Sequence, residues 1–249
     1  MLSKTIIKYI QRLAHKKFRD EHGVFIAEGP KVVAEFLKSG NMKCKSIYAT
    51  VEWFNENAGY LNKYIHKVCS DIVGVNDIEL AEISQLQTPN KVLAVFYKNE
   101  NRLSDLKNNL SLMLDEIQDP GNMGTIIRTA DWFGIKNIIC SNECVDFYNP
   151  KVVQASMGSL SRVSIIYTQL EDFIHKNKGI SIYAATLSGK PLSLFNKLTE
   201  GIILIGNESK GVKENLIKLT ADQITIPKQG EAESLNAAVA CGIILSHIS

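Results

Sequence analysis

The sequence of 249 residues lacks the long apolar runs of a membrane protein and the cysteine patterns of a secreted or zinc-binding one. No apolar run approaches the roughly 18 residues that a membrane span needs. The five cysteines are irregularly spaced, no CxxC is present, and no cysteine–histidine group has zinc-finger spacing. Lys4, Lys8 and Arg12 interrupt the first apolar residues, so no signal peptide is expected. We therefore expect a cytoplasmic protein without a metal.

Two common nucleotide-binding fingerprints are also missing. No GxGxxG follows any predicted strand, and the glycine-containing segment 206–211 is followed by Val212 and Lys213 instead of Lys-Ser or Lys-Thr. ATP hydrolysis and ordinary dinucleotide binding therefore lack their sequence signatures. An α/β enzyme that uses another nucleotide, such as a dehydrogenase, stays open only as a weak alternative.

The positive charge is concentrated at the start of the chain. The net charge is only +2, but residues 1–50 hold ten Lys or Arg against four Asp or Glu. Lys4, Lys8, Arg12 and Lys16 recur every fourth residue, and apolar residues recur at helical spacing on another side. The pattern predicts an amphipathic helix over residues 4–17. Its basic stripe is either a solvated face or a phosphate-binding surface that releases counterions from a polyanion.

The first part of the chain reads as a small α/β unit. Pro30 in a first helical turn and Gly40 just past the end predict a helix from residue 30 to about 38. A second helix is expected over 77–85, and the segment 51–62 stays ambiguous. Strands are expected at 24–27, 46–50 and 91–97. The polar, Asn-rich segment that follows is the best linker in the chain.

The remainder alternates steadily between short apolar strands and helices. Strands are predicted at 111–116, 137–140, 163–166, 181–185, 201–205 and 223–226, and helices at 125–133, 150–159, 170–176, 213–219 and 234–247. This alternation predicts a parallel sheet covered on both faces, with ligands beyond the carboxyl ends of its strands. We therefore predict an α/β protein with one domain over residues 1–98, a linker over 99–109 and a second domain over 110–249.

Three loops at predicted strand ends carry the candidate chemistry. In the first, over residues 119–128, Asn122 is a plausible helix N-cap. Arg128 falls opposite the core face of the following helix. It is either an ordinary surface residue or a guanidinium that binds a phosphate or carboxylate. The second loop, 206–211, places Glu208 between two glycines that allow a close backbone approach.

The third loop, over residues 226–236, leads into an almost wholly apolar helix. Pro227 ends a strand and Gly230 permits a tight turn. Ser234 is the expected N-cap of the helix, which should be buried on most sides. Asn236 would then be a polar group at the start of a buried helix, where it needs hydrogen-bond partners.

Together the three loops resemble the three signature motifs of the SpoU (TrmH-type) RNA ribose 2′-O-methyltransferases of the SPOUT superfamily. The motifs read Asn122-x-Gly124-x-x-x-Arg128, then Gly206-x-Glu208-x-x-Gly211, then Ile226-Pro227 with Gly230 and Ser234-Leu235-Asn236. Lys228 departs from the apolar residue usual after Ile-Pro. The N-terminal part resembles the family's substrate-binding domain, a small α/β unit similar to RNA-binding ribosomal proteins, through its basic helix and the segment 25–29.

The resemblance implies a catalytic domain with a C-terminal trefoil knot and a homodimer with the active site near the subunit interface. It implies S-adenosylmethionine as cofactor and transfer of its methyl group to a ribose 2′-hydroxyl of structured RNA, with rRNA favoured over tRNA. The implied cofactor-binding residues are Gly206, Ile226, Leu235, Asn207 and Ser234. The implied catalytic residues are Arg128, Asn122, Glu208, Ser234 and Asn236. The candidate RNA-binding residues are Lys8, Arg12, Lys16, Lys17 and Arg19.

The roles of the catalytic set follow from their chemistry. An arginine has a pKa above about 12, so Arg128 is expected to hold a phosphate and stabilise developing negative charge instead of accepting a proton. Asn122, Ser234 and Asn236 would orient the hydroxyl, and Glu208 would fix Arg128 or a dimer contact. The alternative function is an RNA-binding or ribosome-assembly factor of the same fold without turnover.

Overall fold

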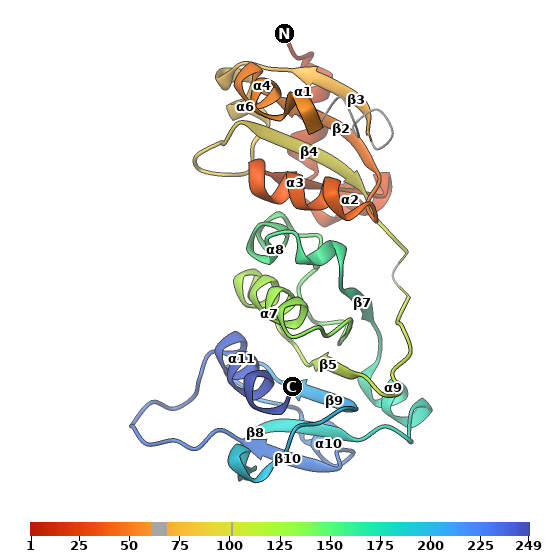
Figure 1. Cartoon of the computed structure of the whole chain (residues 1–249), viewed down its shortest axis with the longest axis vertical. Helices are drawn as coiled ribbons and strands as arrows, with labels where there is room; N and C mark the ends of the chain where they lie inside the picture. The colour runs from red at the N-terminus through yellow and green to blue at the C-terminus, as the bar shows by residue number, and fades with distance from the viewer. Residues whose placement is uncertain (61–68, 101) are drawn as a thin grey trace. The chain divides into compact units, whose positions relative to one another are not determined.

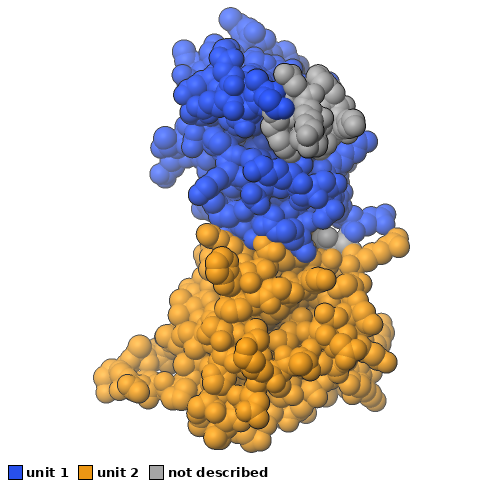
Figure 2. All heavy atoms as spheres, viewed as in Figure 1, with its two compact units in different colours: residues 1–100, 148–162 blue, residues 101–147, 163–249 orange. Residues whose placement is uncertain are grey.

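The structure is a computed structural model that describes residues 1–60, 69–100 and 102–249. The chain forms two compact units, coloured separately in Figure 2. The first contains Met1–Glu100 together with Tyr148–Arg162, and the second contains Asn101–Phe147 together with Val163–Ser249. The segment 148–162 thus packs with the first unit although it interrupts the second in sequence. Residue 101, within the predicted linker, lies outside the described residues.

The first unit is a four-stranded sheet flanked by helices (Figure 1). Its strand order is β1-β4-β2-β3, with β4 antiparallel to β1 and β2, and β2 parallel to β3. Its elements are α1 (Lys4–Arg12), α2 (Lys16–His22), β1 (Val24–Glu28), α3 (Pro30–Ser39), β2 (Cys44–Ala49), α4 (Val51–Tyr60), β3 (Cys69–Gly74), α6 (Asp77–Ile83), β4 (Val92–Tyr97), α8 (Pro150–Ser156) and the short 3-10 helix η2 (Ser159–Ser161).

Local sequence signals explain several of these boundaries. Pro30 occupies the first turn of α3 and Gly40 ends it with a left-handed backbone, as predicted. Asn76 and Glu79 form a reciprocal capping box at the start of α6. The segment that the sequence left ambiguous is helical over Val51–Tyr60, and residues 61 and 62 lie outside the described residues.

The predicted continuous helix over residues 4–17 is wrong, because the chain breaks after α1 and begins again at α2. The side chain of Arg19 binds the backbone at this break. Its Nη1 donates to the carbonyl oxygens of Leu13 at 2.9 Å and Ala14 at 2.7 Å, where the first helix has ended. Arg19 is only 1% exposed. Its predicted contact with RNA is therefore corrected: its guanidinium binds the chain's own backbone.

The second unit is a six-stranded sheet in which every neighbouring pair is parallel, which confirms the predicted α/β class. The strand order is β10-β8-β9-β5-β6-β7. The elements are β5 (Leu110–Leu114), α7 (Pro120–Trp132), β6 (Asn137–Cys140), β7 (Ser164–Tyr167), α9 (Leu170–Lys176), β8 (Ile182–Pro191), the 3-10 helix η3 (Leu192–Leu194), β9 (Gly201–Ile205), α10 (Glu214–Ile217), β10 (Asp222–Thr225) and α11 (Ala237–Ile248).

The sheet topology locates the place where a ligand should bind. From β5 the chain first adds β6 and β7 on one side of that strand. It then crosses to the other side, where β9, β8 and β10 lie in this order outward from β5. The order of strands therefore reverses between β5 and β9, which are paired from Leu110 to Leu114. In open parallel sheets, ligands bind beyond the carboxyl ends of the strands at such a switch point. The first two candidate loops follow β5 and β9.

Two predicted helix caps are corrected. Asp119, instead of Asn122, caps α7, because its Oδ1 accepts a hydrogen bond from the backbone N of Asn122 at 2.8 Å. Asn236, instead of Ser234, caps α11, and its Oδ1 accepts from the backbone N of Ala238 and Val239 at 3.0 and 3.2 Å. Each cap is a short polar side chain directly before its helix, as cap chemistry requires.

Helix α11 is also less buried than its composition predicts. It packs against α7 on one side. Val239 and Ile243, which are one turn apart on α11, remain 50% and 37% exposed, and Trp132 at the end of α7 is 84% exposed. The apolar residues of α11 therefore lie on two faces, one packed against α7 and one exposed at Val239 and Ile243. No helix in the described ranges is long and apolar enough to cross a membrane.

Candidate active site

A cavity of about 810 Å³ lies between strand β8, the loops that follow β9 and β10, and helix α11. Its walls include the apolar side chains of Ile224, Ile226 and Ile244 beside polar groups of Thr186 and Ser234. A cavity of this size with mixed lining matches the usual dimensions of cofactor sites. All five residues that the resemblance implies for cofactor binding line it, namely Gly206, Asn207, Ile226, Ser234 and Leu235.

The two ends of the second loop approach each other so closely that only a glycine fits at position 206. A Cβ on Gly206 would lie 2.3 Å from the carbonyl carbon of Gly211 and 2.3 Å from the backbone N of Val212. Asn207 and Gly211 close the loop with two backbone hydrogen bonds of 3.1 and 2.8 Å. Gly211 has φ +68°, a left-handed conformation that favours glycine.

The three loops meet in a cluster of two amides and one carboxylate. Nδ2 of Asn122 donates to Oε1 of Glu208. Nδ2 of Asn236 donates to Oδ1 of Asn122 at 2.8 Å and to Oε1 of Glu208 at 3.0 Å. Asn122 lies in the first turn of α7, Glu208 in the loop after β9, and Asn236 directly before α11. We call these three residues the amide–carboxylate triad. Since Oδ1 of Asn236 also caps α11, the helix fixes the direction in which its amide donates.

Arg128 does not join this triad. It is exposed on α7, six residues beyond Asn122. Six helical residues correspond to about 9 Å of rise and about 240° of rotation, which carries the side chain away from Asn122. Within the described part of the chain, Arg128 forms no ion pair with Glu208, so the first predicted role of Glu208 is not seen in a single chain, and its alternative role in a dimer contact stays a prediction. Ser234 is exposed and lines the cavity, with no part in the triad.

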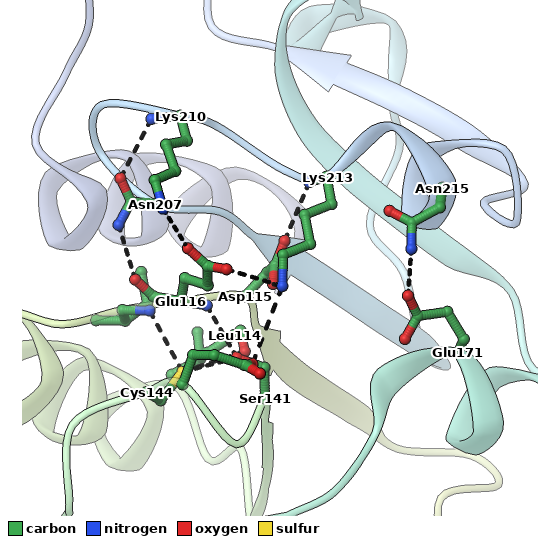
Figure 3. A network of polar contacts seen from close by, with 12 residues as sticks. Leu114, Asp115, Glu116, Ser141, Cys144, Glu171, Asn207, Lys210, Lys213 and Asn215 are labelled. Atoms are coloured by element: carbon green, nitrogen blue, oxygen red, sulfur yellow. Dashed lines mark hydrogen bonds and ion pairs between the residues drawn. The ribbon is translucent and has the colours of Figure 1, made fainter.

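A charged network beneath the second loop was not predicted from the sequence (Figure 3). Nζ of Lys213 lies 2.8 Å from Oε1 of Glu116 and 3.5 Å from Oδ1 of Asp115, and Nζ of Lys210 lies 2.9 Å from Oε2 of Glu116. The ammonium groups of Lys213 and Lys210 lower the pKa of Glu116 to about 2. Asp115 is 1% exposed. Its burial raises its pKa, although the hydrogen bond from the backbone of Lys213 and the charge of Lys213 act in the lowering direction.

Asn207 connects this network to the second loop. Its Nδ2 donates to the carbonyl oxygen of Glu116 at 2.9 Å, and its Oδ1 accepts from the backbone N of Ser209 and Lys210 at 2.9 and 3.2 Å. The Asn207 side chain is thus engaged within the protein, as its backbone N–H and carbonyl are with Gly211. An adjacent Asp-Glu pair directly after an apolar strand was the available sequence signal for this network.

A second, more polar cavity of about 330 Å³ adjoins the triad. The loop after β5 and the segment 207–210 line it, and that same segment also lines the larger cavity. One short loop therefore separates two spaces, with Glu208 of the triad on the boundary of both. Such an arrangement can hold two reactants side by side.

The other predicted residues lie in the first unit. Lys8, Arg12, Lys16 and Lys17 are exposed, and the guanidinium carbon of Arg12 lies 5.1 Å from the ring centre of Phe18. Among the described residues, no group of three or more His, Cys, Asp or Glu side chains could hold a metal ion.

Family models and known relatives match almost the whole chain. The SpoU rRNA methylase family model matches residues 109–246, and the MRM3-like substrate binding domain model matches residues 4–94. The chain is 29% identical to the 23S rRNA (guanosine(2553)-2′-O)-methyltransferase RlmP of Bacillus subtilis, over 97% of this chain and 95% of that protein.

Solved structures agree with the family models. An RNA methyltransferase structure of the TrmH family from Porphyromonas gingivalis superimposes with a TM-score of 0.84 at 33% identity, covering 99% of this chain and 97% of that one. The AdoMet-bound rRNA methyltransferase of Sinorhizobium meliloti gives a TM-score of 0.85 at 31% identity, covering 98% and 94%. S-adenosylmethionine is therefore the expected cofactor. The resemblance predicted from the three motifs is confirmed, and the chain belongs to the SpoU rRNA methylase family.

Proposed function

We propose that this protein transfers a methyl group from S-adenosylmethionine to a ribose 2′-hydroxyl of RNA, and that its substrate is rRNA more readily than tRNA. The observation that carries the proposal is the convergence of the three motif loops on one triad beside the 810 Å³ cavity. The 2′-O-specific name of the B. subtilis relative, which aligns over nearly the full length, supports both the reaction and the rRNA substrate.

The large cavity fits the cofactor. Ile224, Ile226 and Ile244 supply apolar walls for an adenosyl group, and Thr186 and Ser234 supply hydrogen-bonding groups. Gly206, Asn207, Ile226, Ser234 and Leu235 would hold it. When bound, S-adenosylmethionine supplies an electrophilic methyl group on its positively charged sulfur.

The triad would hold the acceptor hydroxyl. Glu208 and Asn236 hold the amide of Asn122 in place, and the contacts within the described residues leave the second amide hydrogen of Asn122 and Oε2 of Glu208 for the hydroxyl. Polar groups held in this way orient a nucleophile without reorganising during the reaction. Glu208 thus acts as a positioning residue for two amides, which replaces the expected pairing with Arg128.

Arg128 would bind the phosphate beside the reacting ribose and stabilise negative charge on its oxygen. Its guanidinium is exposed on α7 and forms no ion pair within the described residues, which leaves both nitrogen edges available for this contact. We expect Arg128→Lys to lose most of kcat, because lysine cannot make a planar bidentate contact. Near-full turnover by that variant would contradict this role.

The catalytic unit is proposed to carry the C-terminal trefoil knot of the family and to work as a homodimer. The uncovered apolar face formed by Trp132, Val239 and Ile243 supports the dimer, because exposed apolar patches of this kind mark interfaces. Val239→Asp should convert a dimer to a monomer in sedimentation equilibrium. Leu194→Asp, which places the same charge at another exposed aliphatic residue, is the matched control. A Val239→Asp protein that still dimerises would contradict this interface.

On the first unit, we propose that Lys8, Arg12, Lys16 and Lys17 contact RNA phosphates from their exposed positions. A cytoplasmic location remains our proposal and is compatible with five free cysteines.

Calorimetric titration tests the proposed cofactor without knowledge of the RNA. S-adenosylmethionine and its demethylated product should bind, and NAD should not. The absence of binding by either ligand, with RNA present, would favour the alternative of an RNA-binding or ribosome-assembly factor without turnover.

A further inference from the structure

One end of the four-stranded sheet carries two tyrosines, each with a lysine ammonium against its ring. Nζ of Lys45 donates to the Oη of Tyr9 at 2.9 Å and lies 4.8 Å from that ring's centre. Nζ of Lys43 lies 5.5 Å from the ring centre of Tyr97. The His22 ring meets the Tyr9 ring edge-on at 5.1 Å. We call these five residues the tyrosine–lysine cluster.

Four separate elements bring the cluster together. Tyr9 comes from α1, His22 ends α2, Lys43 and Lys45 stand at the start of β2, and Tyr97 ends β4. Because β2 and β4 are antiparallel, the start of one meets the end of the other, and the backbone N of Tyr97 donates to the carbonyl oxygen of Lys43 at 2.9 Å. Strand pairing therefore fixes the spacing of the cluster.

The ammonium groups of the cluster have no carboxylate partner in the part of the chain that the structure describes. Within the described residues, neither Lys43 nor Lys45 forms an ion pair with a carboxylate, whereas Lys91 and Lys98 of the same unit each do. Lys43 and His22 are exposed, and Tyr9, Lys45 and Tyr97 are partly exposed. An un-neutralised pair of ammonium groups beside accessible aromatic rings is complementary to a polyanion that carries flat rings.

We propose that the tyrosine–lysine cluster binds a single-stranded segment of the RNA substrate, with bases stacked on Tyr9 and Tyr97 and phosphates paired with Lys43 and Lys45. This inference rests on the proposed function for its choice of RNA as the partner. Stacking on protein rings requires unpaired bases, which favours a single strand over a duplex. The lysines that cover the rings in the free protein are long and flexible, so each ammonium can move from its ring to a phosphate as a base arrives.

The cluster extends the predicted basic stripe along the same helix. Tyr9 directly follows Lys8 on α1, and the exposed Arg12 lies one turn further on. The stripe offers charge alone, whereas the cluster adds rings, which can hold a base and favour an unpaired region of RNA.

Fluorescence anisotropy with the full-length protein tests this assignment. The probe is a labelled oligouridylate of about 12 nucleotides, within the usual site sizes for single strands. Tyr97→Ala should weaken binding by about 5- to 150-fold, the range for loss of one stacked base, and Tyr97→Phe should bind as the native protein does. Lys45→Met should reduce the dependence of log affinity on log salt by about 0.7, the value for one single-strand phosphate.

The matched control is Lys178→Met, which removes an exposed lysine of the other unit and should change neither affinity nor salt dependence. Thermal melting checks the fold of each variant. Because Tyr97 also packs against the core, Tyr97→Phe and Lys45→Met keep the test valid if Tyr97→Ala does not fold.

Native-like binding by Lys45→Met, or by a Tyr97→Ala protein that folds, would overturn the inference. So would tighter binding to an RNA duplex of equal length, or displacement of the oligonucleotide by polyglutamate at equal charge, which would indicate a surface for acidic peptides. Failure of the proposed function is separate, because it would appear as the absence of S-adenosylmethionine binding and methyl transfer in the native protein.

Discussion

Replacing Glu208 with glutamine tests the amide–carboxylate triad most sharply. Glu208→Gln keeps the length of the side chain but removes the charge that accepts from both Asn122 and Asn236. Both amides bind Oε1, and a glutamine oxygen can still accept both of them without charge assistance, so about the worth of one charge-assisted hydrogen bond is lost. Such a bond is worth about 1.5–3 kcal/mol. If that energy positions the acceptor hydroxyl in the transition state, kcat should fall about 10- to 150-fold.

The same substitution should leave folding nearly unchanged. Glu208 and Asn236 are exposed and Asn122 is partly exposed, so water replaces the lost bond in the free protein and the free energy of unfolding should change by less than about 0.5 kcal/mol; the larger value applies where bound RNA excludes water. The assay compares kcat on unmodified rRNA, the Kd for S-adenosylmethionine by calorimetry and the melting temperature. Glu214→Gln removes an exposed glutamate of α10 outside the triad and serves as control. A Glu208→Gln enzyme with native kcat, or one whose loss is entirely in cofactor affinity, would refute the positioning role.

Three further predictions address the loop, the first unit and the charged network. Gly206→Ala must push the backbone of the second loop apart and should weaken S-adenosylmethionine binding at least about tenfold, whereas Gly230→Ala has open space and should bind normally; equal calorimetric affinities would contradict this. Arg19→Met leaves two helix-end carbonyls without their donor and should lower stability by about 2–4 kcal/mol in urea unfolding; an unchanged midpoint would show that the buried guanidinium is dispensable. Because the pKa of Glu116 is lowered from 4.5 to about 2, its pairing stabilises the fold above pH 4.5 and is lost as the pH falls toward 2; Lys210→Met should raise this pKa and move acid unfolding to higher pH, and superimposable acid-unfolding curves would be inconsistent with the pairing.

Periodicity predicted the elements of the second unit well because their signals are local. The predicted bounds of β6, α9 and β9 are the observed ones. Each is a compact apolar run or a short amphipathic turn that its own residues specify. By contrast, β3 was missed because Cys69–Gly74 mixes polar and apolar residues without clear alternation, as befits a strand at the edge of its sheet.

The errors arise where distant residues decide the outcome. The break after α1 depends on Arg19 turning back onto carbonyls of an earlier segment, which a helical pattern does not reveal. The triad joins residues that are 86 and 114 positions apart in sequence. Motif order could therefore nominate Asn122, Glu208 and Asn236, but only the folded chain shows that they bind one another.

The most direct test of the central claim is where a transferred methyl group resides in the RNA. The purified protein is incubated with unmodified rRNA and S-adenosylmethionine that carries a tritiated methyl group, and the RNA is then hydrolysed in alkali. Methylation of a 2′-oxygen blocks cleavage of the neighbouring phosphodiester, so we predict label in alkali-resistant dinucleotides. Label in mononucleotides would show methylation of a base, and the absence of label despite bound cofactor and RNA would show a binding protein; either result would contradict the proposed reaction.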